Sequence, residues 1–398
     1  MTTVEFLAVD ADEHYYEATD AFTRHIEPEF AKRAMQWATI NGKQRLLVGG
    51  RINRFIPNPT FDPVAKPGSL DEYFRGRNPK GSSVADLFGD LEPIRPEYRD
   101  RDARLSVMDR QGVEAAFFFP TLAVGMEQAL VGDPPAMTAA FRAFNRWLEE
   151  DWGFAYRGRI FAAPYIPLTD VDNAVRELEW ALAHDARIII TGVGPVVIPT
   201  GGRSHADSVL DPFWHRVDEA GITVALHGGD SVYSRYIADW GQPAEMEAFR
   251  SGPLRGLLSH DPIHDTVAAL LAARFFTRFP NVRVASIELG SDWVFSLWKK
   301  LKKSFGQAPK MYPEDPRETF RRHVSVSPYY EDDLGALRDL IGASQILMGS
   351  DWPHAEGLAD PISYIDDLRR FDIPDDECRL IMRENAAALT RPRVAVGA

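Results

Sequence analysis

The 398-residue sequence predicts an α/β protein, and specifically a (β/α)8 barrel, on the basis of three observations. Short runs rich in β-branched residues alternate with amphipathic stretches along the chain. Several of these runs are continuously apolar, which is typical of parallel strands covered on both faces. The alternation yields eight strand–helix units, the number that closes a barrel of this kind. A doubly wound open sheet is the alternative, but the phosphate-binding G-x-G-x-x-G signature often found in such sheets follows none of the runs.

Eight segments are expected to form the strands. In chain order they are 4–12, 113–120, 159–166, 187–191, 222–227, 282–289, 323–327 and 345–350. Helices are expected between them at 133–151, 170–185, 206–220, 264–279, 291–305 and 331–341. Aspartates stand at expected helix N-caps and glycines at expected helix ends: Asp170 and Asp207, then Gly112, Gly221 and Gly342. Two separate α/β domains would need a linker that the sequence lacks, so residues 1–398 are expected to form a single domain.

Residues 17–97 do not fit a minimal barrel, because they separate the first strand from the helix that should follow it. They contain a hairpin candidate at 36–56, whose Asn41-Gly42 pair favours a two-residue turn. Barrels of this class carry their chemistry on the loops after the strands, so the insertion is expected to lie over the mouth. A lid and an oligomerisation segment are both consistent with this position.

Composition excludes several classes of partner and cofactor. The 45 basic and 58 acidic residues give a formal net charge of −13, which argues against nucleic acid or an anionic membrane as a main partner. The single cysteine, Cys378, leaves no intramolecular disulfide and no thiolate zinc cluster. There is no secretory signal pattern, and no apolar run approaches the ~18–20 residues of a membrane helix, so a cytoplasmic protein is expected. Any metal ion must therefore be held by histidine, aspartate and glutamate.

The first predicted strand ends in a group of carboxylates and an imidazole, 10-DADEH-14. Side chains alternate along an extended chain, so Asp10, Asp12 and His14 are expected to share one face, opposite to Glu13. A carboxylate oxygen and an imidazole nitrogen two residues apart suit a divalent metal ion. A strand end that simply becomes polar at the surface is the alternative on this motif alone.

Three more predicted strands end in residues of the same kind. His227 ends the fifth within 222-ITVALHGGDS-231, and Glu288 ends the sixth within 282-VRVASIELGSDW-293. Asp351 ends the eighth within 345-QILMGSDWPH-354, with His354 one turn further on. A lone histidine after a strand is more often a core residue, but the carboxyl ends of barrel strands meet at one mouth. Four such ends together predict a metal or acid–base site.

These motifs resemble the amidohydrolase superfamily, in the branch of the amidohydrolase 2 hydrolases and aminocarboxymuconate-semialdehyde decarboxylase. The resemblance covers most of the chain outside 17–97 and rests on 10-DADEH-14, 227-HGG-229, 278-RFPNVRV-284, 349-GSDWPH-354 and 381-IMRENAAALTR-391. It implies four metal ligands: Asp12, His14, His227 and Asp351. Two departures stand out. Asp12 occupies the place of a usual histidine ligand, and Glu288 stands where the decarboxylases usually have a catalytic histidine.

The resemblance implies an enzyme that needs one divalent metal ion. Zinc is expected first, and manganese, magnesium or iron are alternatives because Asp12 makes the ligand set harder. The expected activity is hydrolysis of a small carboxylated or aromatic molecule through a metal-activated water. Asp351 would accept the proton, and His354 or Glu288 would deliver one to the leaving group. Non-oxidative decarboxylation is the alternative activity, and a catalytically inactive binding barrel is a second alternative.

Substrate contacts are expected from arginines and aromatic residues near the strand ends. Arg51 and Arg54 in the insertion, and Arg235 after the fifth strand, are candidates for binding a substrate carboxylate. Trp352 is a candidate for lining an aromatic pocket. The expected partners are a small-molecule substrate and, from the resemblance, a second copy of the chain in a homodimer.

Overall fold

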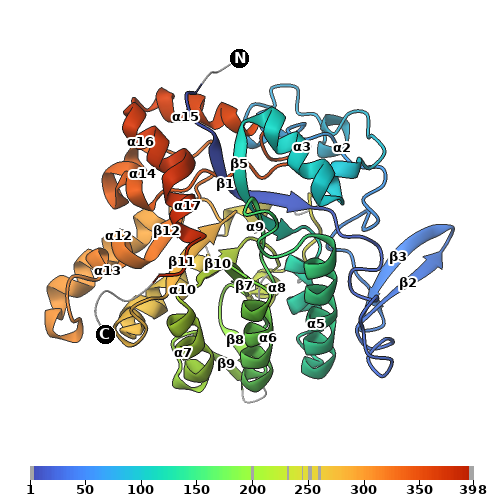
Figure 1. The fold of residues 1–398 in the computed structure, drawn as a ribbon, viewed down its shortest axis with the longest axis horizontal. Helices are drawn as coiled ribbons and strands as arrows, with labels where there is room; N and C mark the ends of the chain where they lie inside the picture. Colours follow the sequence, from blue (N-terminus) through green and yellow to red (C-terminus); the bar gives the residue numbers. More distant parts are fainter. Residues whose placement is uncertain are drawn as a thin grey trace.

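The computed structural model describes residues 4–198, 201–230, 233–243, 245–249, 253–258 and 261–393, and it has the predicted α/β barrel architecture (Figure 1). Seven regular strands build the barrel. They are β1(Ala8–Tyr15), β5(Val113–Pro120), β6(Ile160–Ala162), β7(Ile188–Thr191), β10(Thr223–His227), β11(Arg283–Ile287) and β12(Val324–Val326). All pair in parallel, in the orders β1-β5-β6 and β12-β11-β10-β7.

Isolated parallel bridges join the two sheets at both edges. They link Tyr165 with Ile190, Val326 with Ile346, and Glu13 with Trp352. The segment that starts at Ile346 thus takes the eighth strand position, although it does not form a regular strand over the predicted range 345–350. Ala11 N donates to Met348 O over 2.8 Å, which ties this segment to β1. The ring of parallel backbone pairing is therefore continuous around all eight positions.

Helices follow the strands and cover the outside of the barrel. Those named in the sequence prediction are α5(Pro134–Asp151), α6(Val171–Ala183), α7(Asp211–Ala220), α10(Pro262–Ala272), α11(Phe275–Arg278), α12(Asp292–Gln307) and α14(Leu334–Ile341). The others are α3(Arg101–Gln111), α4(Met126–Leu130), α8(Ser234–Asp239), α9(Pro253–Leu257), α13(Pro316–His323), α15(Tyr364–Arg370), α16(Asp375–Arg379) and α17(Asn385–Leu389). Among the described residues, no helix is long and apolar enough to cross a membrane.

The structure confirms the helix caps and helix ends that the sequence predicts at Asp170, Gly112 and Gly221. The Asp170 side chain accepts from Asn173 N at the start of α6, and left-handed Gly112 and Gly221 end α3 and α7. Asp207 caps a short 3-10 helix, η3(Ser208–Leu210), which precedes α7.

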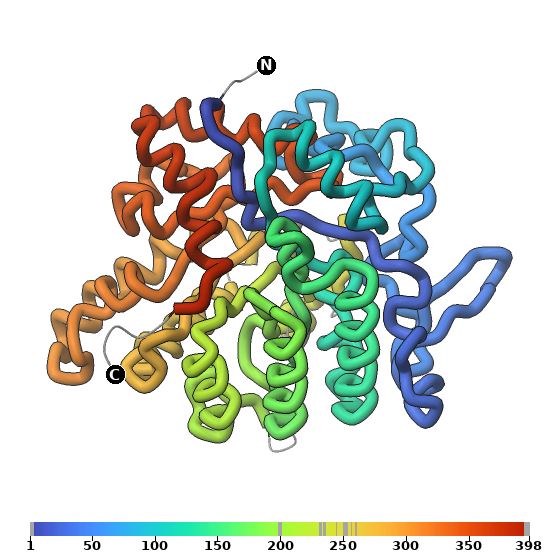
Figure 2. The backbone as a smooth tube through the Cα atoms, in the orientation of Figure 1, coloured from blue at the N-terminus to red at the C-terminus, as the bar shows by residue number. Residues whose placement is uncertain are grey.

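The insertion after β1 forms an arm and a covering segment. Its hairpin has strands β2(Met35–Ile40) and β3(Lys43–Val48), followed by β4(Arg51–Ile52), and it projects from the side of the barrel (Figures 1 and 2). Asn41 and Gly42 both have positive φ, 53° and 73°, as a two-residue type I′ turn requires. Further along come α1(Asp71–Phe74), α2(Val84–Leu87) and the 3-10 turn η1(Pro96–Tyr98).

The covering segment docks on the loop after the eighth strand position. Gly68 N donates to His354 O and Leu70 N to Ala355 O. The insertion thus touches the loop that carries His354, while its role as a lid or as a subunit contact stays a prediction.

Candidate metal centre

A bulge at the end of β1 sets the direction of its acidic side chains. Asp10 pairs with Ala116 and Glu13 with Phe118, so three steps along β1 match two along β5. The expected shared face of three side chains is therefore broken at Asp10. Its Oδ1 accepts from Asp12 N and from Ser350 N, each over 3.0 Å, and thereby holds β1 against the eighth strand position.

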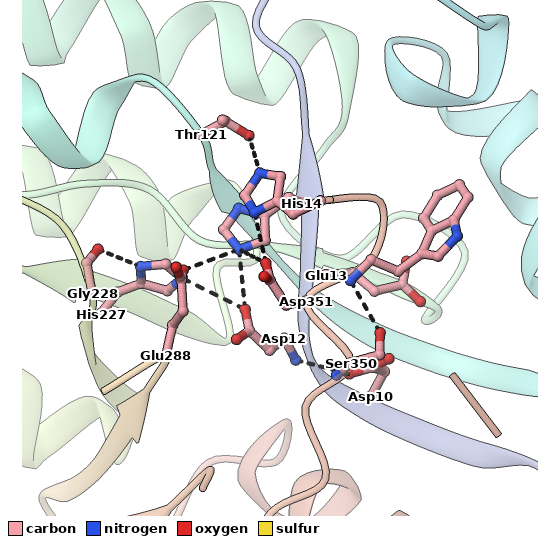
Figure 3. A network of polar contacts seen from close by, with 12 residues as sticks. Asp10, Asp12, Glu13, His14, Thr121, His227, Gly228, Glu288, Ser350 and Asp351 are labelled. Carbon is pink, nitrogen blue, oxygen red and sulfur yellow. Dashed lines mark hydrogen bonds and ion pairs between the residues drawn. The ribbon is translucent and has the colours of Figure 1, made fainter. Parts of the chain in front are cut away.

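Four side chains from three strand ends converge at the mouth of the barrel (Figure 3). Each of Asp12, His14, His227 and Glu288 offers one ligand atom, and these atoms all lie within 4.8 Å of one another. His14 Nε2 lies 3.3 Å from Asp12 Oδ1 and 3.5 Å from Glu288 Oε2. His227 Nε2 lies 3.5 Å and 3.3 Å from the same two oxygens. These four residues are called the metal cluster below.

Asp351 and His354 extend the cluster from the loop after the eighth strand position. Asp351 Oδ1 lies 3.2 Å from His14 Nε2 and 2.6 Å from His354 Nδ1. The rings of His14 and His354 stack with their centroids 3.9 Å apart. Asp351 is thus within reach both of the cluster and of an imidazole outside it.

The donor atoms fit a divalent ion. Two atoms bound to one ion at about 2.1 Å lie about 3.0–3.4 Å apart, close to the spacings of 3.2–3.5 Å found here. Among the described residues, Asp12 Oδ1, His14 Nε2 and His227 Nε2 are buried and have no hydrogen-bond partner. A buried polar atom without a partner is costly, and a shared cation would satisfy all three at once. Nitrogen and oxygen donors in this mixture suit zinc, manganese or iron.

Backbone strain and close packing hold two of the carboxylates in place. Glu288 and Asp351 have positive φ angles, 53° and 57°, a conformation that costs free energy for residues with a side chain. Gly228 allows the first of these turns to pack closely, because a Cβ there would lie 2.4 Å from Glu288 O. His227 Nδ1 bonds Gly228 O over 2.8 Å, which fixes the ring so that Nε2 faces the cluster.

The imidazoles and carboxylates of the site shift one another's pKa values. Burial alone lowers the pKa of His14, but Asp12 and Glu288 raise it to about 10. Burial raises the pKa of Asp12, yet the nearby imidazoles of His14 and His227 outweigh it and leave this pKa below its ordinary value. For Asp351, burial and the Glu288 charge both raise the pKa.

The hydroxyl of Thr121 fixes the tautomer of His354. Thr121 Oγ1 donates to Tyr15 O over 2.9 Å, so towards His354 it acts as an acceptor. His354 Nε2, 2.9 Å from this hydroxyl, therefore carries the hydrogen. The Nδ1 lone pair of neutral His354 then faces Asp351. Burial and the nearby His14 lower the pKa of His354, which favours this neutral form.

The structure adds residues that the sequence prediction did not name. Thr121 lies just after β5, and Glu356 lies in the same loop as His354. Glu356 is half-buried and offers an oxygen within 4.8 Å of oxygens of Glu288 and Asp351. Burial and the Glu288 charge raise the pKa of Glu356 to about 7. The only sequence signal for Glu356 is its place two residues after His354, and Thr121 carries none.

Buried Arg104 supports the end of β1 from behind. It forms an ion pair with Glu13 over 3.0 Å and donates to His14 O over 2.6 Å. Both side chains are fully buried. This pair explains why Glu13 points away from the metal cluster, as the sequence predicts.

The structure does not bring the other predicted substrate contacts to the metal cluster. Arg51 lies exposed in β4, and Arg54 lines a cavity of about 790 Å³ beside the hairpin, where Glu247 lies 3.6 Å away. Trp352 is buried and packs on Arg104 and Tyr98. Arg235 belongs to α8, but its side chain lies outside the described residues.

A parallel barrel with imidazoles and carboxylates converging at its strand ends belongs to the class of metal-dependent barrel enzymes. The family model for amidohydrolases of the Amidohydro_2 type matches residues 87–391, and the chain belongs to this family. This finding confirms the resemblance drawn from the strand-end motifs. No match was found among curated proteins.

Solved structures agree with this assignment. A crystal structure of an amidohydrolase from Mycobacterium avium subsp. paratuberculosis K-10 is 43% identical, with a TM-score of 0.91 over 98% of this chain and 100% of that one. A dihydroxybenzoic acid decarboxylase from Polaromonas sp. JS666, with bound manganese, is 19% identical over 81% and 93% of the two chains, with a TM-score of 0.57. A 5-carboxyvanillate decarboxylase from Sphingomonas paucimobilis is 15% identical over 98% and 100%, also with a TM-score of 0.57. The two decarboxylases share the fold with this chain.

Proposed function

We propose that the protein is a metal-dependent hydrolase that cleaves a small carboxylated or aromatic molecule. The observation that carries the proposal is the convergence of unpartnered Asp12 Oδ1, His14 Nε2 and His227 Nε2 at ligand spacing. Asp12, His14, His227 and Glu288 would hold the ion, and Asp351 lies near enough to join them. A catalytically inactive barrel has no need for such an arrangement. Zinc is the proposed ion, with manganese, magnesium or iron as alternatives.

When bound, the ion would lower the pKa of a water molecule at the cluster and polarise a substrate oxygen. The remaining work falls to side chains of this chain. Asp12, His14 and His227 are buried, at 3%, 1% and 5% exposure, whereas the Glu288 side chain is 26% exposed, so the site opens to solvent on the side of Glu288.

Proton transfer is assigned to the pair of Asp351 and His354. Asp351 Oδ1 accepts the proton released by the attacking water, and it lies 2.6 Å from the lone pair at His354 Nδ1. His354 then holds the proton for the leaving group, while Thr121 keeps its ring in the correct orientation. Glu288 is assigned to the ion rather than to proton transfer, since both imidazoles of the cluster approach its Oε2.

Non-oxidative decarboxylation is the second candidate. Several solved structures with the same fold are described as decarboxylases of aromatic acids. In that reaction, a protonated side chain must deliver a proton to carbon, and His354 is the group placed beside the cluster to do so. The replacement of the usual histidine by Glu288 favours hydrolysis as the first choice.

An isotope experiment separates the two reactions. The metal-loaded protein is incubated in H₂¹⁸O with a panel of small carboxylated amides and esters, and with aromatic acids. Hydrolysis places one ¹⁸O atom in the acid product, which mass spectrometry detects. Release of CO₂ with a solvent hydrogen in the product would replace the hydrolase proposal by the decarboxylase one.

A further inference from the structure

A cavity of about 200 Å³ adjoins the metal cluster, and His227 forms part of its wall. Most of the other side chains that line it are apolar, among them Val124, Val193, Met246 and Leu258. Its volume is below the ~300–1,000 Å³ typical of sites for drug-sized ligands. The cavity therefore suits a compact molecule with an apolar body that reaches the metal cluster at His227.

Arg255 of α9 is the one arginine or lysine among the described residues that line this cavity. Its side chain is 18% exposed, so the guanidinium is largely removed from water. Nη1 donates to Pro243 O over 3.0 Å, which anchors the group, whereas Nη2 lies 3.9 Å from Asp230 Oδ1, beyond hydrogen-bond range. A guanidinium held by one edge presents its remaining N–H groups in the planar fork that matches a carboxylate.

The charge of the neighbouring site explains why such a cation is needed. Asp12, Glu288, Asp351 and Glu356 contribute four carboxylates, and a divalent ion balances only two of them. An anionic substrate would be repelled unless a positive group faced it. Among the described residues, Arg255 forms no ion pair with any of these four carboxylates. Its ion pair with Asp230, which also lines the cavity, is too long for a hydrogen bond, so the guanidinium keeps N–H groups that can donate to a bound carboxylate.

We propose that Arg255 binds the carboxylate of a compact, largely apolar substrate in this cavity, apart from the group that reacts at the metal cluster. The inference deepens the proposed function and rests on it, because it assumes that the substrate reacts at the metal cluster. It replaces Arg51 and Arg54 as the carboxylate-binding residues. It also predicts that the recognised carboxylate stays in the product, as hydrolysis elsewhere in the molecule requires.

Calorimetric titration with benzoate and with its neutral analogue benzamide tests the proposal. The proteins are wild type, Arg255→Gln, Arg255→Lys and, as a matched control, Arg110→Gln on the exposed side of α3. Each is measured with metal loaded and after chelation, with metal content and melting temperature recorded. Benzoate should bind wild type more tightly than benzamide, and Arg255→Gln should weaken benzoate binding at least about tenfold. Arg255→Lys should lose less of the affinity for benzoate than Arg255→Gln does. The affinity for benzamide should be the same in all of these proteins.

Two results would overturn the inference. One is equal benzoate affinity in wild type and Arg255→Gln, with binding lost on chelation, since the carboxylate would then sit on the ion. The other is no preference of wild type for benzoate over benzamide. Binding that depends on Arg255 in a protein that hydrolyses nothing would instead count against the proposed function alone. If the melting temperature of Arg255→Gln is much lower than that of wild type, the benzoate affinities of Arg255→Lys and wild type are compared instead. Equal affinities would then overturn the inference.

Discussion

Asp351 Oδ1 and His354 Nδ1 lie 2.6 Å apart, and the Thr121 hydroxyl on the far side of the imidazole fixes which nitrogen faces the carboxylate. The arrangement links a residue beside the metal cluster to one outside it. Thr121 thereby orients the His354 ring, a role that its position after β5 in the sequence does not indicate.

Replacing Thr121 by valine should lower kcat about tenfold or more while leaving metal content unchanged. The valine has nearly the same shape but cannot accept from His354 Nε2, so the other tautomer and other ring orientations become populated. Thr121→Ser keeps the hydroxyl and should restore most of the rate. Steady-state kinetics beside elemental analysis make the comparison, and an unchanged kcat in Thr121→Val would remove His354 from the proposed proton path.

Gly228→Ala should disturb the cluster through the backbone. The added Cβ would meet Glu288 O at 2.4 Å, and Glu288 already has a strained positive φ. We expect a loss of about 1–3 kcal/mol in unfolding free energy and weaker metal binding. Gly132→Ala is the control, because nothing lies within 4 Å of the added carbon. Urea denaturation of chelated protein and metal titration measure the two effects, and identical behaviour of both variants would contradict the packing argument.

Arg104→Met should cost about 3–5 kcal/mol of unfolding free energy, because Glu13 would remain buried without its partner. The end of β1 should also loosen, since Arg104 donates to His14 O. Urea denaturation of chelated protein isolates the structural effect from that of the ion. Arg110→Met on the surface of the same helix should change stability by less than about 0.5 kcal/mol. A change of unfolding free energy as small as this in Arg104→Met would show that the ion pair of Arg104 with Glu13 makes no net contribution to stability.

Stability should fall as the pH drops from about 6.5 towards 4. Burial is the largest cause that lowers the pKa of His323 to about 4, and the charges of Arg393 and Arg322 add to it. In this window the unfolded chain binds a proton that folded His323 does not, so acid favours unfolding. At pH 5 the cost is about 2 kcal/mol relative to pH 7.5.

Urea denaturation of wild type and His323→Leu at pH 7.5 and 5.0 checks this prediction. The difference between the two pH values should shrink by about 2 kcal/mol in the variant. His205, buried and with its pKa also lowered to about 4, should add a second contribution that His323→Leu leaves intact. The same pH difference in both proteins would show that His323 takes up its proton without unfolding.

The barrel and the core of the site could be predicted because parallel strands impose both. Short continuously apolar runs that alternate with amphipathic stretches are typical of parallel strands covered on two faces, and the carboxyl ends of such strands meet at the mouth of a barrel. His227 and Glu288 follow directly from this rule, and Asp12 and His14 follow it despite the bulge. The family match and the barrel confirm that reasoning at the level of fold and enzyme class.

Other features depend on contacts that no local pattern encodes. The bulge in β1 turns Asp10 towards Ser350. The alternation of side chains along a regular strand predicts instead that Asp10 faces the metal site together with Asp12 and His14. Trp352 neighbours Asp351 in sequence, but its ring packs on Arg104, which is 248 positions away along the chain. Arg255 lies in the five-residue helix α9, which is too short to show a helical periodicity in the sequence, so only the folded chain shows that it lines a cavity next to His227.

Metal content tests the central claim most directly. Protein prepared without chelators, and then incubated with zinc, manganese or iron, is measured by plasma mass spectrometry beside His227→Ala and His14→Ala. We predict about one equivalent of a divalent metal in wild type and much less in both variants, with Arg110→Gln as the surface control. No metal in wild type after these incubations, or equal metal in all four proteins, would contradict the account.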